Sequence, residues 1–101
     1  TSDDDRLNGT SGDDTIDAGS GNDLIKSGAG NDFIDGGSGD DRIDADSGNN
    51  TIQAGEGNDR INAKWGNDTI DAGAGDDRIE AGDGDNSVAG GEGNDQIRTG
   101  Y

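Results

Sequence analysis

The sequence predicts an all-β solenoid in which two nine-residue repeats form one coil and each repeat supplies a short strand. Three observations predict this class. An aliphatic residue recurs every nine residues from Leu7 to Ile97, a glycine recurs four positions before it from Gly12 to Gly93, and the two residues after each of these glycines are Asn or Asp. A strict short period is typical of solenoids, because each repeat buries its apolar residue only by stacking on another repeat.

The repeats divide the chain into three parts. Residues 1–8 hold a partial copy, with Asp5 at the sixth position and Leu7 at the eighth; residues 9–98 hold ten full copies, and residues 99–101 begin another. No insertion or deletion interrupts the period. The aliphatic eighth position is occupied in turn by Leu7, Ile16, Ile25, Ile34, Ile43, Ile52, Ile61, Ile70, Ile79, Val88 and Ile97.

Each copy is interpreted as a turn of about six residues followed by a strand of about three. Glycine costs about 1 kcal/mol per residue in a helix relative to alanine, whereas it permits the positive φ angles of tight turns. Asn and Asp tolerate left-handed conformations and bond their own backbone. Segments such as "DTI" and "DRI" suit a short strand, which spans about 10 Å. Two copies are therefore expected to form one coil with a strand on each side.

Composition narrows the functional classes. The 101 residues carry 24 Asp and Glu against 7 Lys and Arg, a net charge of −17, which argues against nucleic acid or an anionic membrane as a partner and favours cations. The chain has no cysteine and no histidine, so disulfides, thiolate-bound metals, Ser–His triads and most zinc sites are excluded. No segment approaches the roughly 20 apolar residues of a membrane span, and no signal peptide is visible.

Two copies, "GGSGDDRID" at 36–44 and "GGEGNDQIR" at 90–98, match every defined position of Gly-Gly-x-Gly-x-Asp-x-U-x, in which U is a large aliphatic residue. The sequence therefore resembles the calcium-binding nonapeptide of repeats-in-toxin (RTX) proteins. Most other copies have Ala or Ser at the first position. The resemblance implies a right-handed parallel β-roll. It also implies that calcium lies between turns stacked two copies apart, bound by sixth-position Asp side chains and by backbone carbonyls of the early turn positions.

The even-numbered copies, counted from Gly9, keep the repeat intact at its second and sixth positions. Their expected calcium ligands are the side chains of Asp23, Asp41, Asp59, Asp77 and Asp95 and the carbonyls of Gly19, Gly21, Gly37, Gly39, Gly55, Gly57, Gly73, Gly75, Gly91 and Gly93. The odd-numbered copies offer Asp14, Asp32 and Asp68. We expect about four strong sites on the even side, with a fifth that uses Asp5 left open, and fewer or weaker sites on the odd side.

Every departure at the second and sixth positions falls in odd-numbered copies. Asn50 and Asn86 replace the sixth-position aspartate, and Thr10, Asp46 and Lys64 replace the second-position glycine. Asp46 could offer a substitute carboxylate near Asn50, and Lys64 could place its ammonium group where a cation would bind. Drift in a redundant repeat is the alternative explanation.

Stacked coils would hold equivalent aspartates about 4.8 Å apart. Two such charges repel by about 0.9 kcal/mol in water and about 3.5 kcal/mol at an effective dielectric constant of 20. Calcium accepts six to eight oxygen ligands and would remove this repulsion. Because the apolar core is small, the chain is predicted to be largely unfolded without calcium and to fold as it binds the metal.

The outward strand positions raise further hypotheses. A row of arginines on the even side (Arg6, Arg42, Arg60, Arg78) is interpreted as a solvated face, with an anionic partner as the alternative. The odd side carries Thr15, Phe33, Thr51, Thr69 and Ser87, a row similar to the faces of ice-binding solenoids except at Phe33. Phe33 and Trp65 are expected to lie outside the core.

The function predicted from the sequence is that of a calcium-binding folding and secretion scaffold without catalytic activity. The resemblance implies a bacterial protein exported by a type I system to the cell surface or the medium. We expect a monomer that belongs to a larger protein with flanking domains, since no capping segment is visible. An adhesion or ice-binding repeat is the alternative.

Overall fold

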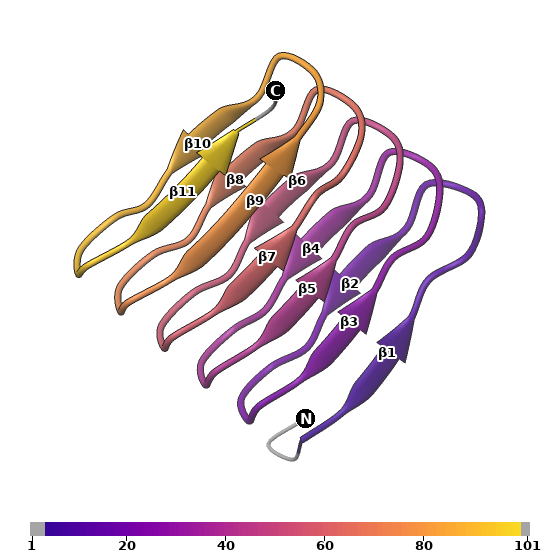
Figure 1. Cartoon of the computed structure of the whole chain (residues 1–101). Helices are drawn as coiled ribbons and strands as arrows, with labels where there is room; N and C mark the ends of the chain where they lie inside the picture. Colours follow the sequence, from indigo (N-terminus) through magenta and orange to yellow (C-terminus); the bar gives the residue numbers. More distant parts are fainter. Residues whose placement is uncertain (1–3, 100–101) are drawn as a thin grey trace.

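The computed structural model describes residues 4–99, in which it places eleven short parallel β-strands and no helix (Figure 1). The strands are β1 (Arg6–Asn8), β2 (Thr15–Asp17), β3 (Leu24–Lys26), β4 (Phe33–Asp35), β5 (Arg42–Asp44), β6 (Thr51–Gln53), β7 (Arg60–Asn62), β8 (Thr69–Asp71), β9 (Arg78–Gly82), β10 (Ser87–Ala89) and β11 (Gln96–Thr99). Each predicted copy of the repeat thus yields one strand, and Gly100 and Tyr101 lie outside the described residues.

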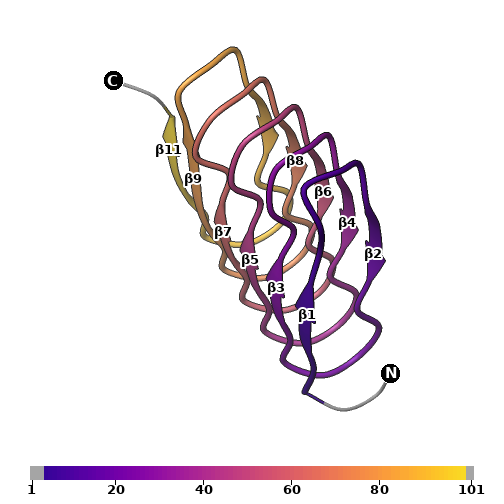
Figure 2. The same cartoon turned by 90° about the vertical axis from the view of Figure 1, so that its right-hand side faces the viewer.

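The strands alternate between two facing sheets, so that the chain winds as a flattened coil (Figure 2). One sheet has the order β1-β3-β5-β7-β9-β11 and the other β2-β4-β6-β8-β10. Paired residues are eighteen apart, as in Ile25↔Ile43 and Ile34↔Ile52. Two repeats therefore form one coil, and the predicted all-β parallel solenoid, of about five turns, is confirmed.

The turns form two rows at opposite ends of the strands (Figure 1). We call the turns of the even-numbered copies, together with the six-stranded sheet that follows them, the even side. The strands of the even side have odd-numbered labels, because β1 belongs to the partial copy and the first full copy supplies β2. The turns of the odd-numbered copies and the five-stranded sheet are the odd side. Successive turns on one side are eighteen residues apart, as the sequence predicts.

The core is a single layer of aliphatic side chains between the sheets. Seven isoleucines at the eighth position are at most 1% exposed: Ile25, Ile34, Ile43, Ile52, Ile61, Ile70 and Ile79. In a strand, alternate side chains share a face, so the positions two before and two after each isoleucine also point inward. These are the sixth position of the same copy and the first position of the next.

The first position forms a second core row that the sequence analysis did not predict. Six alanines at this position are fully buried: Ala18, Ala45, Ala54, Ala63, Ala72 and Ala81. Ser27 occupies the same place and satisfies its hydroxyl by donating a 3.1 Å hydrogen bond to the carbonyl of Ala45. The change from glycine to alanine at the first position therefore adds apolar contact.

The apolar rows are less buried at the two ends of the roll. Leu7, Ile16 and Val88 are only partly buried, and Ile97 on β11 is 47% exposed. The expectation that every eighth-position residue packs inside is wrong for Ile97, because β11 is a terminal strand of its sheet among the described residues. Phe33 and Trp65 lie outside the core, as predicted, at 43% and 56% exposure.

The second and fourth positions of most turns require a left-handed backbone. Gly55 and Gly57 have φ angles of 91° and 121°, and the non-glycine residues Asp46 and Lys64 are held at φ 60° at the second position. A Cβ on Gly55 would collide with the carbonyl oxygen of Gly37 in the preceding coil. Glycine is therefore required there both by φ and by close stacking. The described residues contain no helix long and apolar enough to cross a membrane.

Candidate metal sites

The sixth-position side chains point into the roll where each turn meets its strand. Six aspartates predicted as calcium ligands are at most 2% exposed: Asp23, Asp32, Asp41, Asp59, Asp68 and Asp77. Asp14 and Asp95, in the first and last full copies, are only partly buried. The structure thus brings the predicted carboxylates together in two rows, one along each row of turns.

One oxygen of each buried carboxylate joins neighbouring coils. Asp41 Oδ1 accepts a 2.9 Å hydrogen bond from the backbone N–H of Asp23, and Asp59 Oδ1 accepts a 2.8 Å bond from Asp41. The same bond links each consecutive sixth-position pair from Asp5 to Asp95 and from Asp14 to Asn86. Each of these bonds satisfies a backbone N–H at the start of a strand.

The other carboxylate oxygen, Oδ2, is buried without a hydrogen-bond partner in the same six aspartates. Four of these oxygens lie on the even side, and those of Asp32 and Asp68 lie on the odd side. A buried carboxylate oxygen is costly unless a donor or a cation faces it. The unpartnered oxygens therefore indicate positions where a bound cation or a proton would offset the cost of burial.

In the copies that begin with glycine, Oδ2 of the sixth-position aspartate lies close to the beginning of its own turn. A Cβ added to first-position Gly36 would be 2.8 Å from Asp41 Oδ2, and one added to Gly90 would be 2.6 Å from Asp95 Oδ2. The backbone at the start of the turn thus lies beside the carboxylate, and in the Asp41 copy this is an oxygen without a hydrogen-bond partner.

The carbonyls predicted as further ligands point along the stack. A Cβ on Gly37 or Gly39 would meet the carbonyl oxygen of Gly19 or Gly21, eighteen residues earlier. The same contact recurs in each following coil, where every carbonyl faces the glycine eighteen residues later. The carbonyls concerned are those of Gly37, Gly39, Gly55, Gly57, Gly73 and Gly75. The carbonyls of Gly73 and Gly75 face Gly91 and Gly93. The space between stacked turns is therefore lined by backbone oxygens. Those of Gly19 and Gly37 also accept 3.2 Å bonds from the N–H groups of Ser38 and Glu56.

Within residues 4–99, no three acidic side chains converge as they would in a site built from carboxylates alone. The residues that would hold a cation here are the aspartates with an unpartnered Oδ2, together with the backbone carbonyls of the turns. This donor set, hard oxygens in a flexible glycine-rich frame, suits calcium, which accepts six to eight oxygens; magnesium demands near-ideal octahedral geometry. The residues present fit the metal that the repeat implies.

Burial makes a charge in the even-side row unfavourable. It raises the pKa of Asp59 to about 8; the carboxylates of Asp41 and Asp77 add to the rise, whereas the hydrogen bond from the Asp41 N–H opposes it. Burial likewise raises the pKa of Asp41 and of Asp77 to about 6, and on the odd side it raises the pKa of Asp68. A bound cation would favour the ionised form of these groups.

The odd-side substitutions pair with one another. Lys64 Nζ lies 3.4 Å from Asp44 Oδ2 and 3.9 Å from Asp46 Oδ1. Asp46 thus lies beside Lys64 rather than supplying a carboxylate to Asn50, and the ammonium group of Lys64 lies against two carboxylates that do not belong to the sixth-position row. Neither alternative raised by the sequence for these two residues is supported.

The first odd-side turn has its own hydrogen-bond pattern. Thr10 donates its backbone N–H to Asp14 Oδ2 at 2.6 Å, and its hydroxyl lies 2.9 Å from Asp14 Oδ1. Both oxygens of Asp14, an expected calcium ligand, are therefore already occupied by a neighbouring threonine. Thr10 is also not at positive φ, unlike Asp46 and Lys64.

The fifth position has a role that the sequence analysis missed. Asn22 Oδ1 accepts a 2.7 Å bond from the N–H of Asp40, and Asp40 Oδ1 accepts a 2.8 Å bond from Asn58. Equivalent bonds run along both rows of turns. In these bonds each backbone N–H donates to the preceding coil, whereas in the sixth-position bonds each N–H donates to the following coil. Each coil is therefore hydrogen-bonded in both directions. The sequence feature that could have predicted this role is the restriction of the fifth position to Asn or Asp, because each of these side chains carries an oxygen acceptor.

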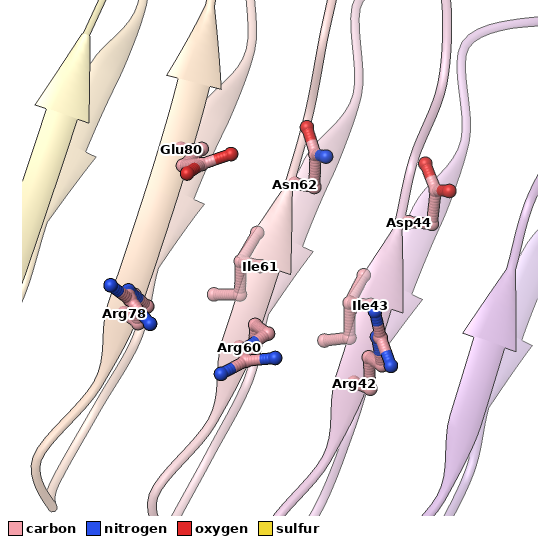
Figure 3. A pocket seen from close by; sticks show the side chains of 8 residues that line it. All are labelled: Arg42, Ile43, Asp44, Arg60, Ile61, Asn62, Arg78 and Glu80. Atoms are coloured by element: carbon pink, nitrogen blue, oxygen red, sulfur yellow. The ribbon is translucent and has the colours of Figure 1, made fainter.

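The outward rows form in register, as the sequence predicts. Arg42, Arg60 and Arg78 lie side by side on β5, β7 and β9, and Asp44, Asn62 and Glu80 follow two residues further along the same strands (Figure 3). On the odd side, Phe33 lies between Thr15 and Thr51. The threonine row is therefore interrupted.

Two stacks of glycine-rich turns, each with a row of buried acidic oxygens that lack hydrogen-bond partners, define a β-solenoid of the kind that can bind cations. The family model of the RTX calcium-binding nonapeptide repeat, in four copies, matches residues 1–34, 35–70 and 63–97. The chain belongs to this family, whose repeats bind calcium. No curated protein and no solved structure matches the chain.

Proposed function

We propose that this chain is a calcium-responsive module that folds when it binds calcium and serves as a folding and secretion scaffold for a larger secreted bacterial protein. The observation that carries the proposal is the set of six buried Oδ2 atoms without partners. A chain with net charge −17 that buries such groups gains from a cation at each of them.

Calcium, when bound, supplies the positive charge and the coordination bonds that offset carboxylate burial. The chain's own residues do the rest. Asp23, Asp41, Asp59 and Asp77 present oxygens on the even side, the second- and fourth-position glycines let the carbonyls approach, and the Oδ1 bonds between coils orient each carboxylate. The odd side offers Asp32 and Asp68. We propose about four strong sites on the even side and fewer on the odd side.

Low cytosolic calcium would leave such a chain unfolded before export, and calcium outside the cell would drive folding. This order suits passage through a secretion channel. The family's typical occurrence in secreted bacterial proteins supports it. We further propose that the module is a monomer without catalytic activity and works beside flanking domains.

The test is a calcium titration followed by far-UV circular dichroism and by the fluorescence of Trp65, combined with calorimetry for the number of ions. The expected result is a disordered chain in excess chelator, a β-rich chain in calcium, reversal by chelator and no folding in magnesium. A chain that is equally structured in excess chelator would refute calcium-induced folding.

The alternative is that an outward sheet face binds a ligand, as in adhesion or ice-binding repeats. The in-register hydroxyls of Thr51, Thr69 and Ser87 favour the ligand-binding alternative, whereas Phe33 interrupts the row. Thermal hysteresis measured on the calcium-loaded chain tests it, and its absence removes the ice-binding alternative.

A further inference from the structure

Asn50 occupies the sixth position of an odd-side turn and is 1% exposed. Its Oδ1 accepts a 2.8 Å hydrogen bond from the N–H of Asp32, as an aspartate oxygen does in the other turns. That bond determines the orientation of the amide, because the Nδ2 group must point the other way. Nδ2 lies 3.3 Å from the carbonyl oxygens of both Ala45 and Gly48, at the first and fourth positions of the same turn.

Asn86 repeats this arrangement two coils later. Its Oδ1 accepts a 2.8 Å bond from the N–H of Asp68. Its Nδ2 faces three carbonyl oxygens of its own turn, those of Ala81 at 3.3 Å, Gly82 at 3.2 Å and Gly84 at 3.4 Å. Each bond is long for an N–H···O contact, so the amide acts as one donor group shared among several oxygens.

In the aspartate turns, the atom that corresponds to Nδ2 is the unpartnered Oδ2. An acceptor oxygen there faces other acceptor oxygens and needs a cation between them. An amide nitrogen there carries the protons that those carbonyls accept. Replacing one oxygen with an NH₂ group thus removes the charge and supplies the missing donor.

We propose, on the basis of the calcium-binding function above, that the amides of Asn50 and Asn86 take the place of the metal, so that these two turns fold without a bound ion. Calcium on the odd side is then confined to turns that carry aspartate, and the metal turns of Asp32 and Asp68 alternate with the amide turns of Asn50 and Asn86.

The alternation changes the charge spacing along the odd side. Asp32 and Asp68 are two coils apart, about 9.6 Å, whereas neighbouring even-side aspartates are one coil apart, about 4.8 Å. Because Coulomb repulsion falls inversely with distance, Asp32 and Asp68 repel about half as strongly as two neighbouring even-side aspartates. The odd side is therefore the part of the roll that needs less calcium to become ordered.

The test counts bound calcium in Asn50→Asp, in the double variant Asn50→Asp/Asn86→Asp and in Gln53→Glu, by calorimetry and native mass spectrometry. Gln53→Glu is the charge-matched control, since Gln53 is exposed on β6 in the same coil as Asn50. We expect one additional ion for Asn50→Asp, two for the double variant and none for Gln53→Glu. Asn50→Asp should also need more calcium than the original chain to reach half-maximal folding.

An unchanged ion count in Asn50→Asp, with calcium binding intact in the original chain, would overturn this inference alone. An original chain that binds no calcium would overturn the proposed function itself. The original chain also provides a test that needs no variant. In calcium, the side-chain NH₂ signals of Asn50 should exchange with solvent more slowly than those of the partly exposed Asn62 on β7. Equal exchange rates would contradict the proposal.

Discussion

Each buried sixth-position aspartate divides its two oxygens between two tasks. Asp59 Oδ1 accepts the N–H of Asp41 in the preceding coil, which is a structural bond, and Oδ2 is buried without a partner. Comparing aspartate with asparagine and alanine at this position therefore separates the contribution of Oδ1 from that of Oδ2. Asparagine keeps the structural acceptor but replaces the proposed metal ligand with an amide, and alanine removes both.

Asp59→Asn is expected to lose one bound calcium and keep the roll folded in calcium, as the Asn50 turn does. Asp59→Ala should lose the same ion and also leave the N–H of Asp41 without its acceptor, at a further cost of about 1–3 kcal/mol. Calorimetry gives the ion count, and thermal unfolding in saturating calcium gives the stability. Equal unfolding temperatures for the two variants would show that the Oδ1 bond contributes nothing.

At the scale of the element, a strand of three residues contributes one large apolar side chain. Its neighbours eighteen residues away supply the hydrogen bonds and the packing, so a central strand is covered on both sides and a terminal strand on one. Ile61 on β7 is 1% exposed, whereas Ile97 on β11 is 47% exposed. The same residue type at the same repeat position is thus used in two environments.

Ile61→Ala is expected to destabilise the calcium-loaded chain by about 2–5 kcal/mol, the usual cost of a cavity in a packed core. Ile97→Ala removes the same atoms from a half-exposed site and should cost less than about 1 kcal/mol, since large effects come from buried positions. Denaturant unfolding in saturating calcium compares them. A loss at Ile97 as large as that at Ile61 would contradict the burial assigned to β11.

At the scale of the whole molecule, each coil contacts only the coils before and after it, as in other solenoids. Stability is then highest in the middle of the stack and lowest at its ends. The partial burial of Leu7, Ile16 and Val88 and the exposure of Ile97 follow the same gradient.

Amide hydrogen exchange of the calcium-loaded chain should follow this gradient. Strands β5, β6 and β7 are expected to exchange most slowly, and β1, β2, β10 and β11 most rapidly, because opening an end breaks one interface and opening the middle breaks two. Exchange resolved by mass spectrometry of peptides measures it. Uniform protection along the chain would show that the roll opens as one unit.

Much of this architecture could be predicted because the period is so regular. The nine-residue spacing of Ile43, Ile52 and Ile61 indicated which residues stack, and the eighteen-residue register follows from placing two copies in a coil. The exposure of Phe33 and Trp65 was also predicted correctly. The buried Ala54 row was missed, although strand alternation from Ile52 by two residues indicates it.

Other features depend on contacts between coils that no single repeat reveals. The pairing of Lys64 with Asp44 joins two copies that are not stacking partners. The opposite directions of the fifth- and sixth-position bonds depend on which way each side chain leans along the stack, as with Asn22 and Asp41. A repeat pattern carries no information on that direction.

The sequence by itself determined the period, the strand in each copy, the acidic rows and the restriction of the departures to one side. It could do so because period and composition are local properties of each copy. Only the tertiary structure decided which oxygen of each aspartate is already bonded and which is unpartnered, and that Asn50 and Asn86 turn an amide toward the same carbonyls. These outcomes depend on groups eighteen residues apart that meet only when the coils stack.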